Sequence, residues 1–141
     1  MKIILDTNCF ISSIGKKSPY RNVFDAFLNN KFVLCLSTEI LLEYEEIFLE
    51  KWGDDVTENL LARIIRASNI ELCNPYFDFK LSTDEDDNKF INTYLSSNAD
   101  YLVSNDSDII KLKNNGFPKM AIKTLQEFSQ MLKDKAGDFG K

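Results

Sequence analysis

Short apolar runs alternate with amphipathic stretches along the whole chain. The runs are bounded by polar turn residues and predict buried strands near 3–5, 32–36, 70–72, 101–104 and 120–122. Between them, apolar residues recur at the spacing of a helix that covers a core. This alternation predicts an α/β fold, a Rossmann-like three-layer α/β/α sandwich around a central parallel sheet of about five strands.

Six stretches carry the helical pattern, and the first three open with capping signals such as a serine followed by proline. The last three are recognised by their apolar faces alone. The six helices are predicted to start at Ser18-Pro19, at Ser37 or Thr38, and at Asp55, and to lie around 90–95, 109–112 and 125–132.

The chain of 141 residues is long enough for one domain and leaves little room for a second. We expect that domain to occupy 1–132, followed by a polar C-terminal tail at 133–141. The 17 basic and 22 acidic residues give a formal net charge of −5, which argues against coating nucleic acid by bulk positive charge. The chain has no histidine, which excludes Ser-His-Asp and Cys-His catalysis and histidine-ligated zinc.

The three cysteines, Cys9, Cys35 and Cys73, have no C-x-x-C spacing and lie in or beside apolar runs. This pattern is typical of buried, reduced thiols. The N-terminal apolar run ends at Asp6, far short of a signal-peptide core, and no run reaches the length of a membrane span. Together these features predict a cytoplasmic protein that does not enter a membrane.

Aspartates follow two of the clearest strands almost at once. Asp6 comes after the first strand and Asp106 after the fourth. Ligands of parallel sheets bind beyond the carboxyl ends of the strands, so these two carboxylates would meet at one edge if the strands are neighbours. Aspartate is also a common turn former at strand ends, and this explanation stays open for either residue taken alone.

Helical periodicity selects two further acids. On a wheel of about 100° per residue, Asp87 falls within the apolar stripe of its helix, whereas Asp86 points away from it. Glu43 lies at the border of the buried face of its own helix, and an ordinary solvated glutamate is the alternative. Asp108 either joins these acids or caps a short helix. The remaining acids of the 84–86 run are explained as caps and partners of the helix dipole.

Converging carboxylates without histidine or cysteine ligands call for a hard, oxygen-seeking cation, Mg²⁺ or Mn²⁺. Such an ion activates water and neutralises charge on a phosphate, which suits phosphodiester hydrolysis. Basic side chains could contact a polyanionic substrate, although solvated surface positions explain most of them equally well. The candidate contacts are Lys16, Lys17, Arg21, Lys111, Lys113 and Lys119.

Five stretches together resemble the PIN-domain ribonucleases, in particular the VapC-type toxins of bacterial toxin-antitoxin modules. Each stretch alone is common, but the ordered set is specific and extends from Met1 to about Leu132. Ser104 stands where threonine is common in the family, and Asn105 where many members have glycine. The matching stretches are Ile3-Ile4-Leu5-Asp6-Thr7-Asn8, Ser18-Pro19, 37–44, 84–90 and 99–108.

The resemblance implies an endoribonuclease, dependent on Mg²⁺ or Mn²⁺, that cleaves RNA as the toxin of a toxin-antitoxin module. It also implies a cognate antitoxin as partner and a homodimer or higher oligomer. The sequence offers a wide apolar arc as the surface for such contacts, formed by Ile40, Leu41, Ile47, Phe48, Leu49, Trp52, Leu60 and Leu61. The implied catalytic and metal-binding acids are Asp6, Glu43, Asp87 and Asp106, with Asp108 as an auxiliary ligand and Thr7, Asn8 and Ser104 orienting them.

Three other interpretations remain at this stage. A haloacid-dehalogenase-type phosphatase needs a second acid two positions after the first, where this chain has Asn8. A receiver-like signalling domain needs further acids after its first strand, where only Asp6 is available. A catalytically silent PIN-like interaction module fits the sequence as well, because turnover cannot be inferred from residue types.

Overall fold

Five parallel strands form one sheet, as the sequence predicts, and the structure gives their order as β3-β2-β1-β4-β5. The computed structural model describes residues 1–139, with side chains through residue 137. All four strand pairs are parallel. The strands are β1 (Lys2–Leu5), β2 (Val33–Leu36), β3 (Ile70–Leu72), β4 (Tyr101–Val103) and β5 (Ile122–Lys123).

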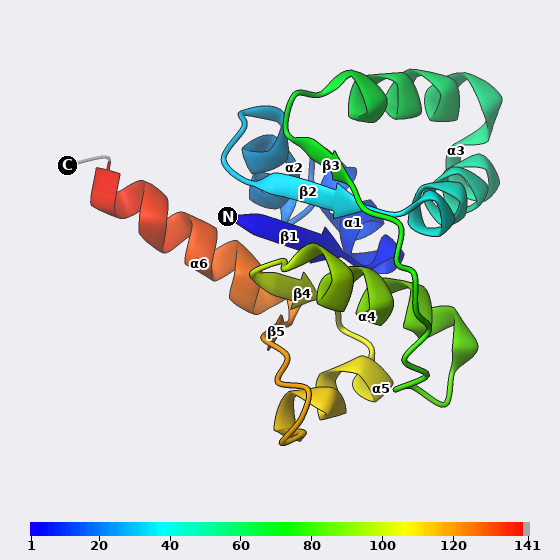
Figure 1. The fold of residues 1–141 in the computed structure, drawn as a ribbon. Coiled ribbons are helices and arrows are strands. Elements are labelled where there is room, and N and C mark those ends of the chain that lie inside the picture. The colour runs from blue at the N-terminus through cyan, green and yellow to red at the C-terminus, as the bar shows by residue number, and fades with distance from the viewer. Residues whose placement is uncertain (140–141) are drawn as a thin grey trace.

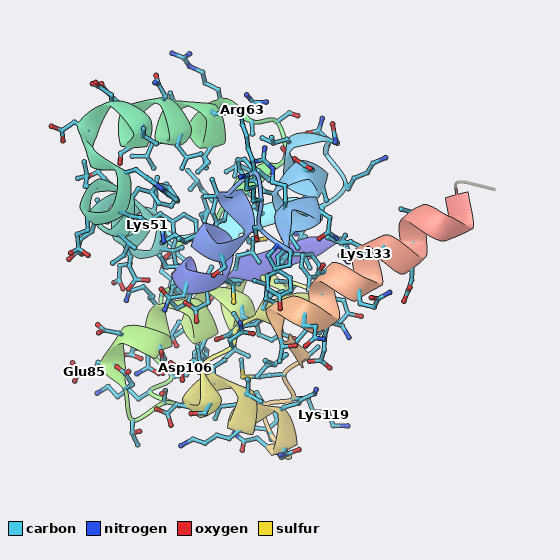
Figure 2. The ribbon with its side chains drawn as sticks, turned by 180° about the vertical axis from the view of Figure 1, so that it is seen from behind. Lys51, Arg63, Glu85, Asp106, Lys119 and Lys133 are labelled. Carbon is cyan, nitrogen blue, oxygen red and sulfur yellow. The ribbon has the colours of Figure 1, made fainter. Side chains whose placement is uncertain are left out.

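Helices cover both faces of the sheet and complete the three-layer sandwich. In Figure 1, α4 lies in front of the strands, whereas α1, α2 and α6 lie behind them, and Figure 2 shows these three from the other side. No helix within residues 1–139 is long and apolar enough to cross a membrane. The helices are α1 (Thr7–Ile14), α2 (Arg21–Leu28), α3 (Thr38–Arg66), α4 (Glu85–Ser97), α5 (Ser107–Ile110), the 3₁₀ turn η1 (Lys111–Asn114) and α6 (Leu125–Phe139).

The helices differ from the sequence prediction in two places. Helix α1 follows β1 after one residue and was not predicted. Helix α2 begins at Arg21 rather than at Pro19, because the Ser18 hydroxyl accepts a hydrogen bond from the Tyr20 backbone N–H and forms a turn there. The two helices expected on either side of residue 54 are present as the two halves of α3, which are separated by a kink at Gly53, where the backbone is non-helical with φ of 79°.

The C-terminal helix is longer than its apolar pattern indicates. Helix α6 runs to Phe139, so 133–139 of the expected tail are helical. Residues 140 and 141 of that tail lie outside the described residues. The division of the chain at 132 remains a prediction.

The strand order reverses around β1, and this reversal positions the site. Strand β1 pairs with β2 on one side and with β4 on the other, with Leu5 opposite Val103. The backbone N–H of Asp6 donates to the Val103 carbonyl at 3.0 Å and extends this pairing by one residue. Consequently the residues that follow β1 and β4 emerge side by side at the carboxyl edge of the sheet, where such folds bind ligands.

Aromatic side chains fill the layer between the sheet and its covering helices. Phe10 stands at their centre, with ring centroids 5.0 Å from Tyr44 and 5.9 Å from Phe24. Such pairs combine large apolar burial with favourable edge-to-face or tilted geometry. We call this group the aromatic core; its members are Phe10, Phe24, Phe27, Tyr44 and Phe48.

The three cysteines are free thiols. Cys9 and Cys35 are buried, as predicted, whereas Cys73 is half-buried. Burial raises the pKa of Cys9 to about 12 and that of Cys35 to about 11. Both thiols are therefore protonated near neutral pH and are poor nucleophiles.

Candidate metal site

The strand-end pair is linked by one hydroxyl. Ser104, the first residue after β4, donates from Oγ to Asp6 Oδ2 at 2.8 Å. The same Oγ accepts a hydrogen bond from the Asp106 backbone N–H at 3.0 Å. Asp106 in turn caps α5, because its Oδ1 accepts from the Asp108 backbone N–H at 2.8 Å. These bonds fix the two aspartates relative to each other across neighbouring strands.

Glu43 reaches the same edge from the first half of α3. Its Oε2 accepts a hydrogen bond from the Thr7 hydroxyl, and its Oε1 lies 2.9 Å from Lys89 Nζ on α4. The next residue, Tyr44, points into the aromatic core and donates from its hydroxyl to the Leu5 carbonyl at 2.5 Å. This bond anchors α3 to the end of β1, directly before Asp6.

Asp87 enters from the first turn of α4. Its side chain is buried, with 6% relative exposure, and its Oδ2 accepts from Ser82 Oγ at 3.3 Å. We call Asp6, Glu43, Asp87 and Asp106 the acidic quartet. Figure 2 labels Asp106 beside the beginning of α4, which Glu85 marks.

The acidic quartet surrounds one small hollow, which we call the acidic pocket. It has a volume of about 160 Å³. Its members come from the junction of β1 and α1, from α3, from α4 and from the β4–α5 connection, so segments far apart in sequence meet there. The pocket is lined by Asp6, Thr7, Asn8, Glu43, Ile47, Asp86, Asp87, Phe90 and Asp106.

The carboxylates act on one another electrostatically. Burial raises the pKa of Asp87 to about 6, and the nearby charges of Asp106, Asp84 and Asp6 add to this rise. The pKa of Asp6 is also raised, mainly by burial and less by Glu43 and Asp106, although the Ser104 hydrogen bond opposes the shift. Neighbouring like charges disfavour ionisation, and a bound cation would reverse this effect.

Asp108 belongs to a second group of acids beside the pocket. Carboxylate oxygens of Asp84, Asp87 and Asp108 lie within 4.8 Å of one another, so Asp87 is shared between the two groups. Asp108 also forms an ion pair of 3.3 Å with Lys111. The structure therefore places Asp108 at the rim of the site rather than in the lining of the acidic pocket.

The early basic residues lie away from the acidic pocket. None of Lys16, Lys17 and Arg21 lines it. Arg21 binds Asp25 at 2.9 Å and the Ile14 carbonyl, and together with Lys16 it borders a separate groove along α3. Of the six candidate basic contacts, Lys111 is the one that forms an ion pair with an acid of the site.

Asp86 borders the acidic pocket, but its side chain is 88% exposed, in keeping with the outward direction that the helical wheel predicts. Sequence reasoning missed two residues here. Ser82, which donates to Asp87, precedes α4 and carries no periodic signal. Lys89 follows Asp87 by two positions, and charge complementarity to Glu43 is the only sequence signal that could have singled it out.

Sequence comparison places the chain in a known family. A profile of the PIN domain matches residues 2–108. The uncharacterized protein MJ1680 of Methanocaldococcus jannaschii is 33% identical over 121 residues, and the match covers 81% of this chain and 76% of that protein.

Solved structures with the same fold have low sequence identity. VapBC2 from Rickettsia felis, bound to a DNA fragment from its promoter, superposes with a TM-score of 0.54 at 20% identity, covering 88% of this chain and 98% of the other. VapC20 of Mycobacterium tuberculosis, a toxin that cleaves the sarcin-ricin loop, gives 0.57 at 13% identity, covering 77% and 93%. The PIN-domain endonuclease Utp24 gives 0.51 at 19% identity, covering 87% and 84%. The fold, the acidic pocket at its strand edge and the matched profile agree, and the chain belongs to the PIN-domain family.

Proposed function

We propose that this protein is an endoribonuclease that hydrolyses RNA phosphodiester bonds with Mg²⁺ or Mn²⁺. The observation that carries the proposal is the convergence of the acidic quartet, from four separate segments, in one small pocket at the switch point of the sheet. Two proteins of the same fold support this reaction class, since VapC20 cleaves the sarcin-ricin loop and Utp24 is an endonuclease.

The donor set fits a hard divalent cation. All four members of the quartet offer carboxylate oxygens, which Mg²⁺ and Mn²⁺ prefer. The raised pKa of Asp6 and of Asp87 shows that their charges lack sufficient compensation in the chain itself. When bound, the ion would supply an activated water and neutralise charge on the phosphate.

The chain's own residues orient the quartet. Ser104 holds Asp6 and the backbone of Asp106 through one hydroxyl, and Thr7 holds Glu43. Fixed carboxylates lose less entropy on binding an ion than mobile ones, and such supporting hydrogen bonds tune the site. In this proposal Asn8 lines the pocket beside Thr7, Asp108 assists at the rim, and Lys111 contacts the RNA backbone.

We further propose that the protein is a cytoplasmic toxin held by a cognate antitoxin and that it self-associates. The VapBC2 structure supports an antitoxin partner. Helix α3 exposes Leu42, Val56 and Ile65, which would be covered in such assemblies. Two residues expected on that surface, Ile40 and Phe48, are instead fully buried in the core. A strict monomer in sedimentation, together with unchanged partner capture by Trp52→Ala, would overturn this assignment.

Cleavage of RNA by the purified protein tests the enzymatic proposal. We expect cleavage with Mg²⁺ or Mn²⁺ and none with a chelator. Asp6→Asn, Asp87→Asn and Asp106→Asn should each lower the rate by orders of magnitude, because each removes one charge that acts in the reaction. Glu85→Gln is the matched control, since Glu85 is an exposed acid of the same helix turn that does not line the acidic pocket.

Two outcomes contradict the proposal. Full activity in a folded Asp6→Asn protein would remove the quartet from the reaction. Absence of cleavage by the folded wild-type protein on single-stranded and structured RNAs, with either metal, would instead identify a silent interaction module. Circular dichroism of each variant establishes that the protein is folded.

A further inference from the structure

One lysine, Lys89, is held in contact with Glu43 of the acidic quartet. Lys89 Nζ lies 2.9 Å from Glu43 Oε1 and 2.9 Å from the Asp86 carbonyl oxygen, with the Asp86 carboxylate at 4.0 Å. Its side chain is only 14% exposed, and its ammonium stands 5.6 Å from the centre of the Phe90 ring. A solvated surface lysine would not be fixed in this way, because holding a long side chain in one geometry costs conformational entropy.

The position of Lys89 determines how Glu43 can act. One oxygen of Glu43 accepts from Thr7 and the other is paired with Lys89. Lys89 does not line the acidic pocket; it lines a second hollow of about 430 Å³ between α3 and α4, which also contains Glu39 and Glu46. Glu43 therefore lines both hollows, with the Lys89 ammonium in one and the three aspartates of the quartet in the other.

Lys89 is, within the described side chains, the one cation that forms an ion pair with a member of the quartet. It neutralises one of four clustered negative charges and lines the hollow that also contains Glu39 and Glu46, where a second divalent ion would otherwise find carboxylates. The three aspartates remain for an ion inside the pocket. The positive charge of Lys89 also weakens the attraction of the acidic quartet for further cations.

We propose that Lys89 is a positioning residue and the resident counter-ion of the acidic site: it holds Glu43 by one oxygen and limits the site to one divalent cation. This inference rests on the proposed metal-dependent function. Lys89 contributes a fixed positive charge to the quartet from outside the pocket that would hold the ion. Glu43 is then oriented by Thr7 and Lys89 before any ion binds.

Counting bound Mn²⁺ tests the inference independently of turnover. The neighbouring acids Asp84 and Asp108 are first removed with Asp84→Asn/Asp108→Asn, because they form a second group that could hold an ion. In this reference background, equilibrium binding followed by electron paramagnetic resonance should give one Mn²⁺ per chain. Lys89→Met keeps the apolar stem of the side chain but removes its charge. We expect this variant to bind a second Mn²⁺ or to bind the first about tenfold more tightly, because a unit positive charge beside the divalent ion is gone. Lys89→Arg should behave as wild type. Lys2→Met is the matched control, because Lys2 pairs with Glu71 at 3.0 Å at the other end of β1.

A double-mutant cycle separates positioning from general charge. In the Glu43→Gln background, Lys89→Met should change Mn²⁺ binding by less than it does in the wild type. The reason is that the Glu43 carboxylate, which the loss of Lys89 would release, is already absent. In RNA cleavage, Lys89→Met should lower the rate although it binds metal more tightly, a combination that simple loss of structure does not produce.

Each possible result of the Mn²⁺ count either supports or overturns the proposed role of Lys89. Two Mn²⁺ ions in the Asp84→Asn/Asp108→Asn background, or a Lys89→Met protein that binds Mn²⁺ as the Lys2→Met control does, would overturn the role of Lys89 and leave the proposed nuclease standing. A folded wild type that binds no Mn²⁺ would instead overturn the metal-dependent function itself. If Lys89→Met does not fold, Lys89→Gln and the Lys89→Arg comparison provide the same count.

Discussion

The acidic pocket and the aromatic core are built by the same elements and follow opposite physical rules. Helix α1 presents Thr7 to the pocket and Phe10 to the core, and α3 presents Glu43 and Tyr44 in the same two directions. In the core, apolar rings exclude water and stabilise the fold. In the pocket, carboxylates are buried close enough to raise the pKa of Asp87 to about 6.

The difference shows how this small domain maintains an unfavourable site. Clustered acids destabilise the metal-free protein, since each buried charge loses hydration and repels its neighbours. The core one helical turn away holds the segments that carry those acids in place. We therefore expect core substitutions to lower stability and pocket substitutions to raise it while abolishing the proposed activity.

The largest expected effect is in the core. Phe10→Ala should lower the free energy of unfolding by about 3–5 kcal/mol, because Phe10 contacts four other aromatic rings and is 1% exposed. Urea denaturation followed by circular dichroism measures this change. A loss below about 1 kcal/mol would show that the aromatic core does not carry the stability attributed to it.

The pocket should respond in the opposite direction. Asp87→Asn should raise the free energy of unfolding of the metal-free protein at pH 7.5 by about 1–2 kcal/mol, because it removes a charge whose pKa burial and neighbouring acids raise. Calorimetry in chelator gives the value, with Glu85→Gln as control. Destabilisation by Asp87→Asn would break the comparison between the two regions.

The raised pKa of Asp87 also predicts a smaller effect, a dependence of the free energy of unfolding on pH. The pKa of Asp87 is raised in the folded state from 3.8 to about 6, so between these values the folded state binds more protons than the unfolded state. Stability from this group is therefore present below about pH 4 and is lost as pH rises through 6. Wild type and Asp87→Asn should differ little at pH 4 and most above pH 6.5. A difference independent of pH would contradict this assignment.

Tyr44 joins the two regions, and its hydroxyl gives the smallest predicted effect. Tyr44→Phe removes the hydrogen bond to the Leu5 carbonyl and should lower the free energy of unfolding by about 1 kcal/mol. Because that carbonyl directly precedes Asp6, we also expect weaker Mn²⁺ binding. Titration calorimetry measures the affinity. Unchanged affinity would show that α3 does not orient Asp6 through this bond.

The fold and the position of the acids could be predicted from the sequence because both depend on short-range patterns. Apolar runs marked all five strands, and the residue after β1 is an acid at the edge where the sheet order reverses. Helix α1 escaped prediction because Thr7 and Asn8 indicate a turn after β1, although Phe10 and Ile11 pack as helical residues.

Other features depend on tertiary contacts that the sequence does not show. The pairing of Lys89 with Glu43 joins residues 46 positions apart. Ser82 reaches Asp87 from an irregular segment. The bend at Gly53 follows from a backbone with φ of 79°, which glycine permits without specifying it. A helical wheel gave both the inward direction of Asp87, which is buried, and the outward direction of Asp86, which is exposed.

The melting temperature as a function of Mn²⁺ concentration tests the central claim most directly, namely that the acidic pocket destabilises the fold until a divalent ion occupies it. The account predicts that millimolar Mn²⁺ raises the melting temperature of the wild type, because bound metal adds RT ln(1 + [L]/Kd) to the free energy of unfolding, about 2.7 kcal/mol at one hundred times Kd. It predicts almost no shift for the Asp6→Asn/Asp106→Asn protein, whose metal-free form should already be more stable than the wild type. An equal shift in both proteins would place the ion elsewhere and contradict the account.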